Sequence, residues 1–344
     1  MVSIHDVAKH CNVSAATVSK AINGRPDISE ATRERVLQAA ADLGYLPNSA
    51  ARSLKTKRTY NLGVLFVDKK KSGLTHEYFS SVLESFKVEA ESHGYDITFI
   101  NQNIGLQSAT YLEHCKHRNV DGVVIACVDF TDPQVLELTY SDIPLVTIDH
   151  IFDDRMAVLA DNVTGLRELV TYLHGLGHRQ IAFIHGEMTA VTRNRLASFH
   201  KTCEALGIVV PDAYLRTSEY HDIAGCAEAT RALLTLPTPP TAIIFPDDFS
   251  AIGGRGVITE LGLSIPSDIS VAGYDGIYLA SVMHPPMTTY LQDTKTLGKI
   301  AAEKLIDLIE QPKTTIAEHI VIPGALITGA SAASPNSIQT NGFE

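Results

Sequence analysis

Charged side chains stand just beyond several apolar segments that have the character of buried parallel strands. They are Asp149 after 145–148, Arg195 after 181–184 and near the start of the next predicted helix, Asp247 and Asp248 after 242–245, and Asp275 after 269–272. Open α/β sheets bind ligands outside the carboxyl ends of their strands, so these groups are expected to meet in one cleft. Carboxylates and a guanidinium there would hydrogen-bond a small polar molecule.

About half of these residues could instead have a structural role. Aspartate is a favoured helix N-cap, and its carboxylate often accepts hydrogen bonds from the backbone of nearby loops. Asp248 and Asp161 are the residues for which capping is the stronger explanation. We therefore place Asp247 above Asp248 as a ligand contact, and keep both interpretations open for Asp161.

Strand and helix signals alternate from Tyr60 onward, which predicts a doubly wound α/β fold with right-handed crossovers. Apolar segments typical of buried parallel strands occupy 62–67, 97–100, 123–127, 145–148, 181–184, 242–245 and 269–272. Helical patterns occupy 79–92, 109–117, 166–176, 196–206 and 224–236. About 280 residues are more than a single hydrophobic core usually includes, so we expect two lobes.

The first sixty residues have a different pattern, of three short helices. Ser3 and Asp6 form a capping-box pair before the first helix, and Ser14 can cap a second helix over 15–22. Ser29 opens a third helix that ends at Gly44. This is the plan of a helix-turn-helix domain, whose second helix enters the DNA major groove, although any three-helix mini-domain gives the same pattern.

The charge is divided unevenly along the chain. Residues 1–60 carry nine Lys/Arg against five Asp/Glu, a net of +4, whereas the remainder carries −15. A basic head on an acidic body confines attraction for phosphate to the head. In so short a segment the imbalance could also arise by chance, so charge alone does not decide the function.

Individual residues carry more information than the pattern. The matching pieces in the head are Asp6-Val7-Ala8, Val13-Ser14, Thr17-Val18-Ser19, Asn23-Gly24, Thr32-Arg33, Leu43-Gly44-Tyr45, Pro47-Asn48, Ala51-Arg52 and Leu54. With them the chain closely resembles the lactose-repressor/galactose-repressor (LacI/GalR) family of bacterial transcription regulators. The resemblance continues over the full length through Asp161-Asn162, Gly165, Gly177-His178-Arg179, Arg195-Leu196, Phe199, Gly273-Tyr274-Asp275 and Gln292-Asp293.

The resemblance implies roles for the head residues. Ala15, Ala16 and Lys20 stand where the family reads base edges, while Ser14, Thr17, Ser19 and Asn23 stand where it holds phosphates. The hinge helix matches 48–55, with Asn48, Ala51, Arg52, Leu54 and Lys55 as DNA contacts. Leu54 matches the leucine that the family wedges into the minor groove, which bends the duplex.

The resemblance also implies the effector site. Arg195 and Asp275 are its strongest contacts, followed by Asp247, with Asp149 and Asp161 added, and Tyr78, Phe79 and Tyr220 as aromatic walls. Polar groups beside flat rings suit a sugar, a sugar derivative or a nucleoside. Ser198 replaces a glycine common in the family, and Asp247-Asp248 replaces the usual Asn-Asp, which adds negative charge that could favour a cationic group.

The resemblance predicts the organisation of the chain. We expect an all-α helix-turn-helix head over 1–46, a hinge helix and linker over 47–59, and a periplasmic-binding-protein-like sensor with two doubly wound parallel sheets over 60–344. Lobe one is placed at about 60–161 plus 293–320, and lobe two at about 162–292 plus 321–344. We expect a homodimer on palindromic operator DNA. The tail beyond Ile322 lacks a leucine heptad, so a tetramerisation bundle is not supported.

Composition agrees with a cytoplasmic regulator. The five cysteines are scattered and never form a CxxC pair, which favours reduced thiols. No apolar stretch is long enough for a membrane helix. The N-terminus lacks the basic and apolar segments of a secretory signal, so we expect a cytoplasmic location.

Two rival classes fit less well. An enzyme is not supported, because no GxSxG elbow, Walker sequence or GxGxxG opening from a strand is present, and Gly253-Gly254-Arg255-Gly256 falls within a predicted helix. The pair His114 and His117 has no further ligand nearby, so a solvated helix face is preferred to a metal site. We therefore expect no cofactor or metal. A periplasmic sugar-binding protein would share the sensor fold but not the basic head.

Overall fold

The computed structural model describes residues 2–22, 24–45, 58–67 and 73–335. The chain divides into two compact units, Met1–Tyr60 and Asn61–Glu344. We call the first unit the head and the second the sensor, and each is described by itself. None of the helices in the described part of the chain has both the length and the apolar character needed to cross a bilayer.

The described part of the head contains the three expected helices, α1 (Ile4–His10), α2 (Ala15–Ile22) and α3 (Glu30–Leu43). The capping box at Ser3 and Asp6 is formed, and the Ser29 side chain accepts a hydrogen bond from the backbone of Thr32. Gly44 ends α3 in the left-handed conformation at φ 65°. These cap signals were readable from the sequence because each depends only on its immediate neighbours.

The head has its own core. Its buried side chains are Val7, Ala8, Cys11, Val18, Ala21, Val36, Ala39 and Ala40. They come from all three helices, so α2 is held by one face while its other face stays accessible. A small core of this kind fixes the orientation of α2 within the head.

The sensor contains two six-stranded sheets. Sheet A has the strand order β13-β7-β6-β5-β1-β2, and all its pairs are parallel. We call this sheet and its helices lobe one. Its strands are β1 (Asn61–Phe66), β2 (Asp96–Phe99), β5 (Gly122–Ala126), β6 (Leu145–Ile148), β7 (Met156–Ala160) and β13 (His319–Ile322). Its other elements are η1 (Gly73–Thr75), α5 (Glu77–Ser92), the hairpin β3 (Asn103–Ile104) and β4 (Gln107–Ser108), α6 (Tyr111–Arg118), α7 (Pro133–Thr139) and α13 (Thr294–Glu310).

Sheet C has the strand order β14-β12-β11-β10-β8-β9 and, with its helices, forms lobe two. It is parallel except for β14, which pairs antiparallel with β12. Its strands are β8 (Ile181–His185), β9 (Leu215–Thr217), β10 (Ala242–Ile244), β11 (Ser270–Asp275), β12 (Thr288–Leu291) and β14 (Ala325–Ile327). Its helices are α8 (Asn162–Gly175), α9 (Ala190–Ala205), η2 (Asp212–Tyr214), α10 (Ile223–Leu234), α11 (Ala251–Glu260) and α12 (Tyr278–Val282).

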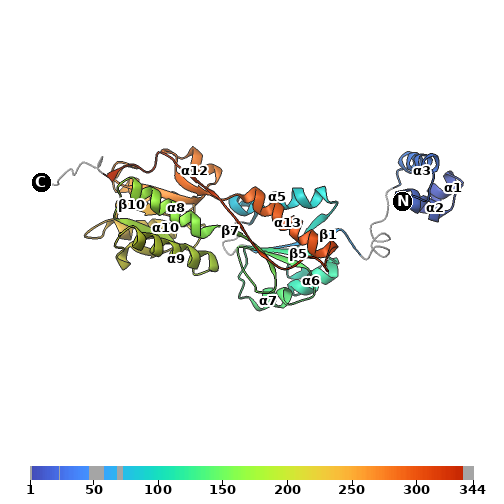
Figure 1. Ribbon diagram of the computed structural model, residues 1–344, viewed down its shortest axis with the longest axis horizontal. Coiled ribbons are helices and arrows are strands. Elements are labelled where there is room, and N and C mark those ends of the chain that lie inside the picture. Colours follow the sequence, from blue (N-terminus) through green and yellow to red (C-terminus); the bar gives the residue numbers. More distant parts are fainter. Residues whose placement is uncertain (1, 23, 46–57, 68–72, 336–344) are drawn as a thin grey trace. The chain divides into compact units, whose positions relative to one another are not determined.

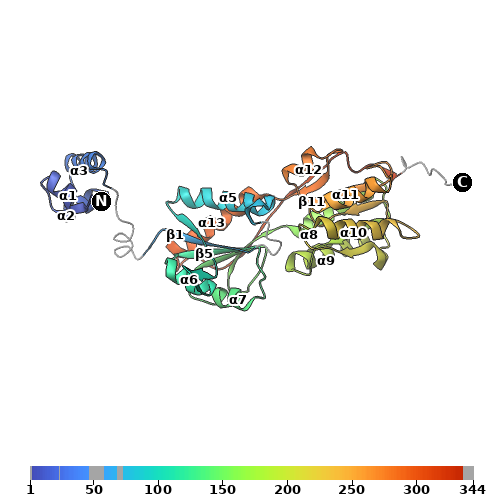
Figure 2. The ribbon, with the colours of Figure 1, turned by 180° about the vertical axis from the view of Figure 1, so that it is seen from behind.

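Helices cover both faces of each sheet. In lobe one, α5 and α13 lie together on one face, and α6 and α7 lie on the other (Figure 1). In lobe two, alternate residues of β8 face opposite cores: Ile181 and Phe183 pack with α8 and α9, while Ala182 and Ile184 pack with α10 and α11. Figure 2 shows the same arrangement from behind. Burial on both faces explains the continuous apolar runs by which the strands were predicted.

The chain passes between the lobes at three places. It leaves sheet A after β7 to begin α8, leaves sheet C after β12 to begin α13, and returns from β13 to β14 (Figure 1). Aspartates cap the helices that follow the first two crossings, with Asp161 accepting from the backbone of Thr164 and Asp293 from that of Thr296. Each of these two crossings therefore has a defined helix start beside it.

The glycine-rich segment 253–256 lies in α11, as predicted, and the glycines serve close packing. A Cβ at Gly253 would overlap the carbonyl oxygen of Ile223 in α10, and one at Gly254 would overlap the Phe245 ring, whereas Gly256 faces open space. We predict that Gly253→Ala destabilises the sensor by about 3 kcal/mol through overpacking. The matched variant Gly256→Ala is expected to stabilise it by about 1 kcal/mol through helix propensity. Urea unfolding of both variants checks this, and equal effects would contradict it.

Several boundaries differ from the prediction: α8 begins at Asn162 and not at 166, β13 extends lobe one to Ile322 and not to 320, and the largest difference concerns α9. Helix α9 begins at Ala190, capped by Thr189, and not near residue 196. Arg195 therefore lies inside the helix, rather than near its start. Polar residues in the first turns, such as Thr192, Arg193 and Asn194, masked the helical pattern in the sequence.

Candidate functional site

The predicted DNA-contacting residues of α2 lie along one accessible stretch of the head. Ser14, Ala16 and Lys20 are exposed, while Ala15, Thr17 and Ser19 are half-buried. The Ser14 hydroxyl accepts from the backbone of Thr17 at 3.1 Å, as expected of a cap. Asn23, Asn48, Ala51, Arg52, Leu54 and Lys55, which complete the predicted set, lie outside the described residues.

Lys20 is held by an acidic neighbour in the free head. Its Nζ lies 2.6 Å from Oδ2 of Asp27, and both side chains are about half exposed. The hydrogen bond from Lys20 lowers the pKa of Asp27. Exposed pairs of this kind are weak, so Lys20 remains available for another acceptor.

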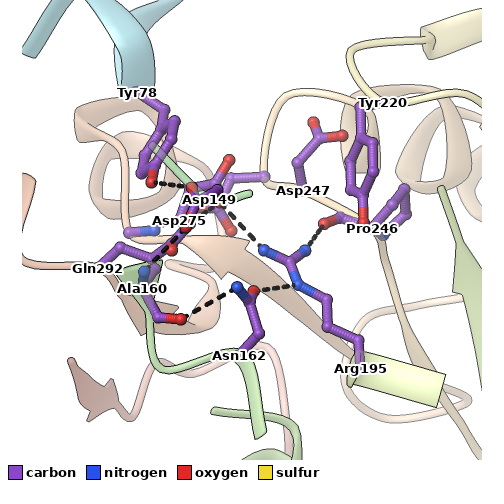
Figure 3. Close-up of polar contacts among 12 residues, drawn as sticks. Tyr78, Asp149, Ala160, Asn162, Arg195, Tyr220, Pro246, Asp247, Asp275 and Gln292 are labelled. Atoms are coloured by element: carbon purple, nitrogen blue, oxygen red, sulfur yellow. Dashed lines mark hydrogen bonds and ion pairs between the residues drawn. The ribbon is translucent and has the colours of Figure 1, made fainter. Parts of the chain in front are cut away.

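Arg195 is the centre of the second candidate site, which we call the arginine cluster: Arg195, Asp275, Asp149, Tyr78, Asn162 and Gln292 (Figure 3). The guanidinium is buried, with Nε donating to Asn162 Oδ1 at 2.7 Å and Nη1 donating to the Pro246 carbonyl at 2.8 Å. Nη2 lies 3.9 Å from Asp275 Oδ1. The planar fork is thus fixed in orientation by groups on both sides.

Asp275 follows β11 as predicted and adopts a positive φ of 96°. Its Oδ1 accepts from Nε2 of Gln292 at 2.6 Å. Burial raises the pKa of Asp275 to about 7, although Arg195 opposes this shift. A carboxyl with this pKa holds its proton for part of the time at neutral pH.

Asp149 comes from lobe one and also has a positive φ, 57°. Its two oxygens accept from the Ala160 backbone at 2.8 Å and from the Tyr78 hydroxyl at 2.9 Å. Burial raises the pKa of Asp149 and of Tyr78. The cluster therefore joins residues that follow strands of both sheets, as the strand-end argument predicted.

Aromatic rings surround the guanidinium. The Tyr274 ring centroid lies 3.5 Å from Arg195 Cζ, and the Tyr220 centroid lies 5.5 Å away. Tyr220 was predicted from the resemblance and Tyr274 was not assigned a role. The Phe79 ring packs edge-on against the Tyr78 ring, with 4.9 Å between the ring centroids, and its centroid lies 5.6 Å from that of Phe66. Phe79 therefore supports the aromatic wall from the side of lobe one. Burial outweighs Arg195 in raising the pKa of both tyrosines.

Three other aspartates have internal partners. Asp247 accepts from the backbone of His221 and from the backbone and hydroxyl of Ser250. Asp248 accepts from the backbones of Gly276 and Ile277 and from Thr289. Asp161 caps α8. These contacts support the loop-tying interpretation for all three, and give no geometric reason to prefer Asp247 over Asp248.

Two amides were missed as functional residues, although both stood within sequence landmarks. Asn162 donates to the Ala160 carbonyl at 3.2 Å while accepting from Arg195, and Gln292 binds Asp275. Each lies at a crossing between the lobes. The arginine cluster is therefore bonded directly to the chain segments on which a movement of the lobes would turn.

Contacts between the lobes also occur at the start of α5. The His76 ring stacks on the His221 ring, with 4.0 Å between their centroids. The His221 ring stacks in turn on the Phe249 ring, with 3.9 Å between their centroids. Next to this stack, Glu77 accepts from the backbone of Tyr278 at 2.6 Å. His76 and Glu77 belong to lobe one and their partners to lobe two, so adjacent residues hold the lobes together here.

The structure corrects one prediction about α6. His114 and Cys115 are buried at 1% and 0% exposure, so this part of the helix is not a solvated face. Burial lowers the pKa of His114, which favours the neutral ring. Among the described residues, no group of three or more His, Cys, Asp or Glu side chains is placed to hold a metal ion.

The raised pKa of Asp275 predicts a pH dependence. The native state binds more protons than the unfolded chain between the ordinary pKa of 3.8 and the folded value of about 7. The stability that this proton supplies is therefore complete below pH 3.8 and is lost as the pH rises through about 7. We expect Asp275→Asn, which stays neutral, to raise the Tm by several degrees at pH 8 and much less at pH 5.

Thermal unfolding of the wild type and the variant at both pH values measures the difference. The exposed Asp153→Asn serves as control and should shift the Tm equally at pH 5 and pH 8. A constant difference between Asp275→Asn and the wild type would show that this carboxyl does not titrate near neutrality.

Comparison with known proteins adds independent information. The profile for bacterial regulatory proteins, lacI family, matches residues 3–48, and that for the periplasmic binding protein-like domain matches residues 170–332. The chain is 30% identical over 331 residues to the ribose operon repressor of Haemophilus influenzae, covering 95% of this chain and 98% of that protein. It is 33% identical over 325 residues to the HTH-type transcriptional repressor PurR of Escherichia coli, covering 91% and 93%. The crystal structure of the lac repressor dimer bound to operator and the anti-inducer ONPF matches with a TM-score of 0.79 and 28% identity, over 96% of this chain and 99% of that one.

Proposed function

Because this chain belongs to the lacI family of bacterial regulatory proteins, we propose that it is a transcriptional repressor whose operator affinity is controlled by a small effector. The observation that carries the proposal is the presence, in one chain, of a helix-turn-helix head and a buried arginine cluster between two sensor lobes. It acts by binding and not by catalysis. Its place of action is the cytoplasm, where operator DNA is found.

The effector is a sugar, a sugar derivative or a nucleoside. The cluster offers carboxylates and a guanidinium to ring hydroxyls, with Tyr220, Tyr78 and Phe79 as walls, and this combination suits such molecules. Arg195, Asp275 and Asp149 are the principal contacts, while Asp247 and Asp161 act by shaping the adjacent loops. The name of the ribose operon repressor is in keeping with this range.

The assembly is a homodimer on a palindromic operator, since a two-fold protein matches a two-fold site. Residues 1–46 form the DNA-binding domain, 47–59 the hinge, and 60–344 the sensor. Effector in the cleft changes the angle between the first lobes of the two protomers, and this decides whether their hinge helices meet over the minor groove. An inducer favours the DNA-free state and a corepressor the DNA-bound state.

A genome-fragment selection tests the function directly. Purified full-length protein is mixed with fragmented genomic DNA, and bound fragments are sequenced, with and without a panel of sugars and nucleosides. We expect a palindrome to be enriched, and the compound that changes its recovery identifies the effector and the sign of its action. If no sequence is enriched with or without any compound of the panel, the proposal that the protein binds an operator under these conditions is contradicted. Calorimetry on the sensor then tests effector binding alone.

Lys20 gives a sharper prediction within the head. A lysine can donate to guanine O6 or N7, and losing one such contact costs about 1–3 kcal/mol. We expect Lys20→Ala to relax the preference at one base pair in each half-site, measured against a library of operator variants. Asp27→Asn is the matched variant, because it releases Lys20 from its pair and should keep the preference. Unchanged selectivity in Lys20→Ala would remove this residue from base readout.

A further inference from the structure

The arginine cluster contains acceptors that can take a hydrogen bond from a ligand. Asp149 and Asp275 supply carboxylate oxygens, and only one oxygen of Asp275 has a hydrogen bond from a described residue. Oε1 of Gln292 is buried and has no hydrogen-bond partner among the described residues, in a side chain that is only 5% exposed. Its Nε2 is already bonded to Asp275 (Figure 3), so this acceptor lies against the cluster. A buried acceptor without a donor is costly, and a ligand hydroxyl or amine would satisfy it.

Several donors of the cluster already have protein partners. Nε and Nη1 of Arg195 donate to Asn162 and to the Pro246 carbonyl, and the Tyr78 hydroxyl donates to Asp149. The second N–H of Nη1 and the N–H groups of Nη2, which lies 3.9 Å from Asp275, keep hydrogen-bonding capacity for a ligand. Because the single N–H of Nε is engaged by Asn162, the Nε–Nη2 edge of the guanidinium cannot bind both oxygens of an anion.

The charge balance points the same way. Asp149, Asp247, Asp248 and Asp275 are buried or half-buried around one arginine. Their mutual repulsion is large enough that the charges of Asp247 and Asp149 contribute to the raised pKa of Asp275. An anionic ligand would add another negative charge in surroundings of low dielectric, where like charges are strongly unfavourable.

We infer that the effector carries no anionic group: it is a polyhydroxy ring, neutral or with an amino group in place of one hydroxyl, and the site rejects carboxylated and phosphorylated analogues. The inference rests on the proposed function, since it concerns the same cleft. It narrows the effector class by charge. Asp149 and Asp275 are assigned the rejection of anions, and Oε1 of Gln292 is assigned to accept a hydrogen bond from the effector.

Matched ligand series test the inference by calorimetry on the full-length protein at pH 7.5. Glucose, galactose and mannose are each compared with their 2-amino and uronic acid forms, ribose with ribose 5-phosphate, and adenosine with its 5′-monophosphate. In every series that binds, we expect the anionic member to be at least about 100-fold weaker than the neutral one. The amino member should bind as tightly as the neutral one, or more tightly. An anionic member that binds tightest in any series would overturn the inference.

Variants then locate the source of the discrimination. Asp275→Asn and, independently, Asp149→Asn are expected to narrow the ratio of neutral to anionic affinity by about tenfold. Asp153→Asn, an exposed carboxylate, should leave the ratio unchanged. Thermal unfolding establishes that each variant is folded. Ratios equal to the wild-type value in both folded cluster variants would overturn the role of these carboxylates.

A separate arm covers effectors outside the panel. Small molecules extracted from bacterial cells are divided on an anion exchanger, and each fraction is tested for a change in the Tm of the full-length protein. Stabilisation by the unretained fraction supports the inference, and stabilisation by the retained fraction alone overturns it. If neither fraction changes the Tm and no series binds, the proposed effector control itself fails, and this inference fails with it.

Discussion

Replacing Arg195 by lysine is expected to abolish the response to the effector while leaving operator binding without effector intact. Lysine keeps the positive charge but loses the planar fork that reaches Asn162 and the Pro246 carbonyl together. Lysine would therefore not hold donors where the remaining N–H groups of Nη1 and Nη2 face the effector. A lost hydrogen bond to a charged group costs about 1.5–3 kcal/mol, so losing two such bonds to the effector predicts a loss of at least about 100-fold in effector affinity. Calorimetry and effector titration of the protein–operator complex measure both quantities.

Arg193→Lys is the matched control. Arg193 lies two residues earlier on the same helix, is exposed, and donates a hydrogen bond to the Met188 carbonyl at 3.4 Å. It should retain wild-type effector affinity. If Arg195→Lys binds effector as tightly as Arg193→Lys, the guanidinium is a structural brace and the effector site lies elsewhere. A comparison of Tm values separates lost binding from lost folding.

Deleting residues 1–60 is expected to abolish DNA binding and leave effector binding unchanged. The sensor has its own cores on both faces of two sheets, and the head has a separate core around Val7, Val18 and Val36. Units with separate cores fold independently. Since specific sites are bound at least about 1,000-fold more tightly than other DNA, the loss is measurable by gel shift with a selected operator. Calorimetry on the truncated protein measures effector affinity.

Val18→Asp in the full-length chain controls for the fold of the head. Val18 is fully buried, so an aspartate there would unfold the head without shortening the chain. This variant should behave like the deletion. Sequence-specific binding by the truncated protein would assign DNA recognition to the sensor, and a loss of effector binding would show that the sensor depends on the head. Effector binding without any DNA binding in the intact protein would favour a sugar-binding protein instead of a repressor.

Local signals made much of the fold predictable. Ser3, Ser29 and Gly44 mark helix ends because cap chemistry involves only near neighbours. The buried strands, such as β5 and β6, are apolar on both faces and stand out in the sequence. Strands β7, β12, β13 and β14 were not predicted. The apolar segment of β7 was overlooked, whereas β13 pairs with the distant β7 and that pairing has no local signature. The antiparallel pairing of β14 in a sheet expected to be parallel depends on the same long-range contacts.

The site was predictable in part for the same reason. Strand ends and the resemblance selected Arg195, Asp275 and Asp149, which the structure brings into one cluster. Asn162 and Gln292 stood within the landmarks of the resemblance but received no role, since an amide becomes informative only when its partner across the chain is known. The sequence also could not distinguish a carboxylate that is free to bind a ligand from one that accepts hydrogen bonds within its own loop. Asp247 belongs to the second kind.

The interleaved lobes have a consequence for synthesis on the ribosome. Strand β13 is the last to join sheet A and β14 the last to join sheet C, and the two follow one another along the chain. The three described helices of the head and their core are complete once Tyr45 has been made, whereas neither lobe can close its sheet until nearly all of the sensor has emerged. Until then the edges of β7 and β12 lack their final partners, and unpaired edges are templates for aggregation. Nascent chains that end short of β13 should therefore present a folded head on a sensor that depends on chaperones.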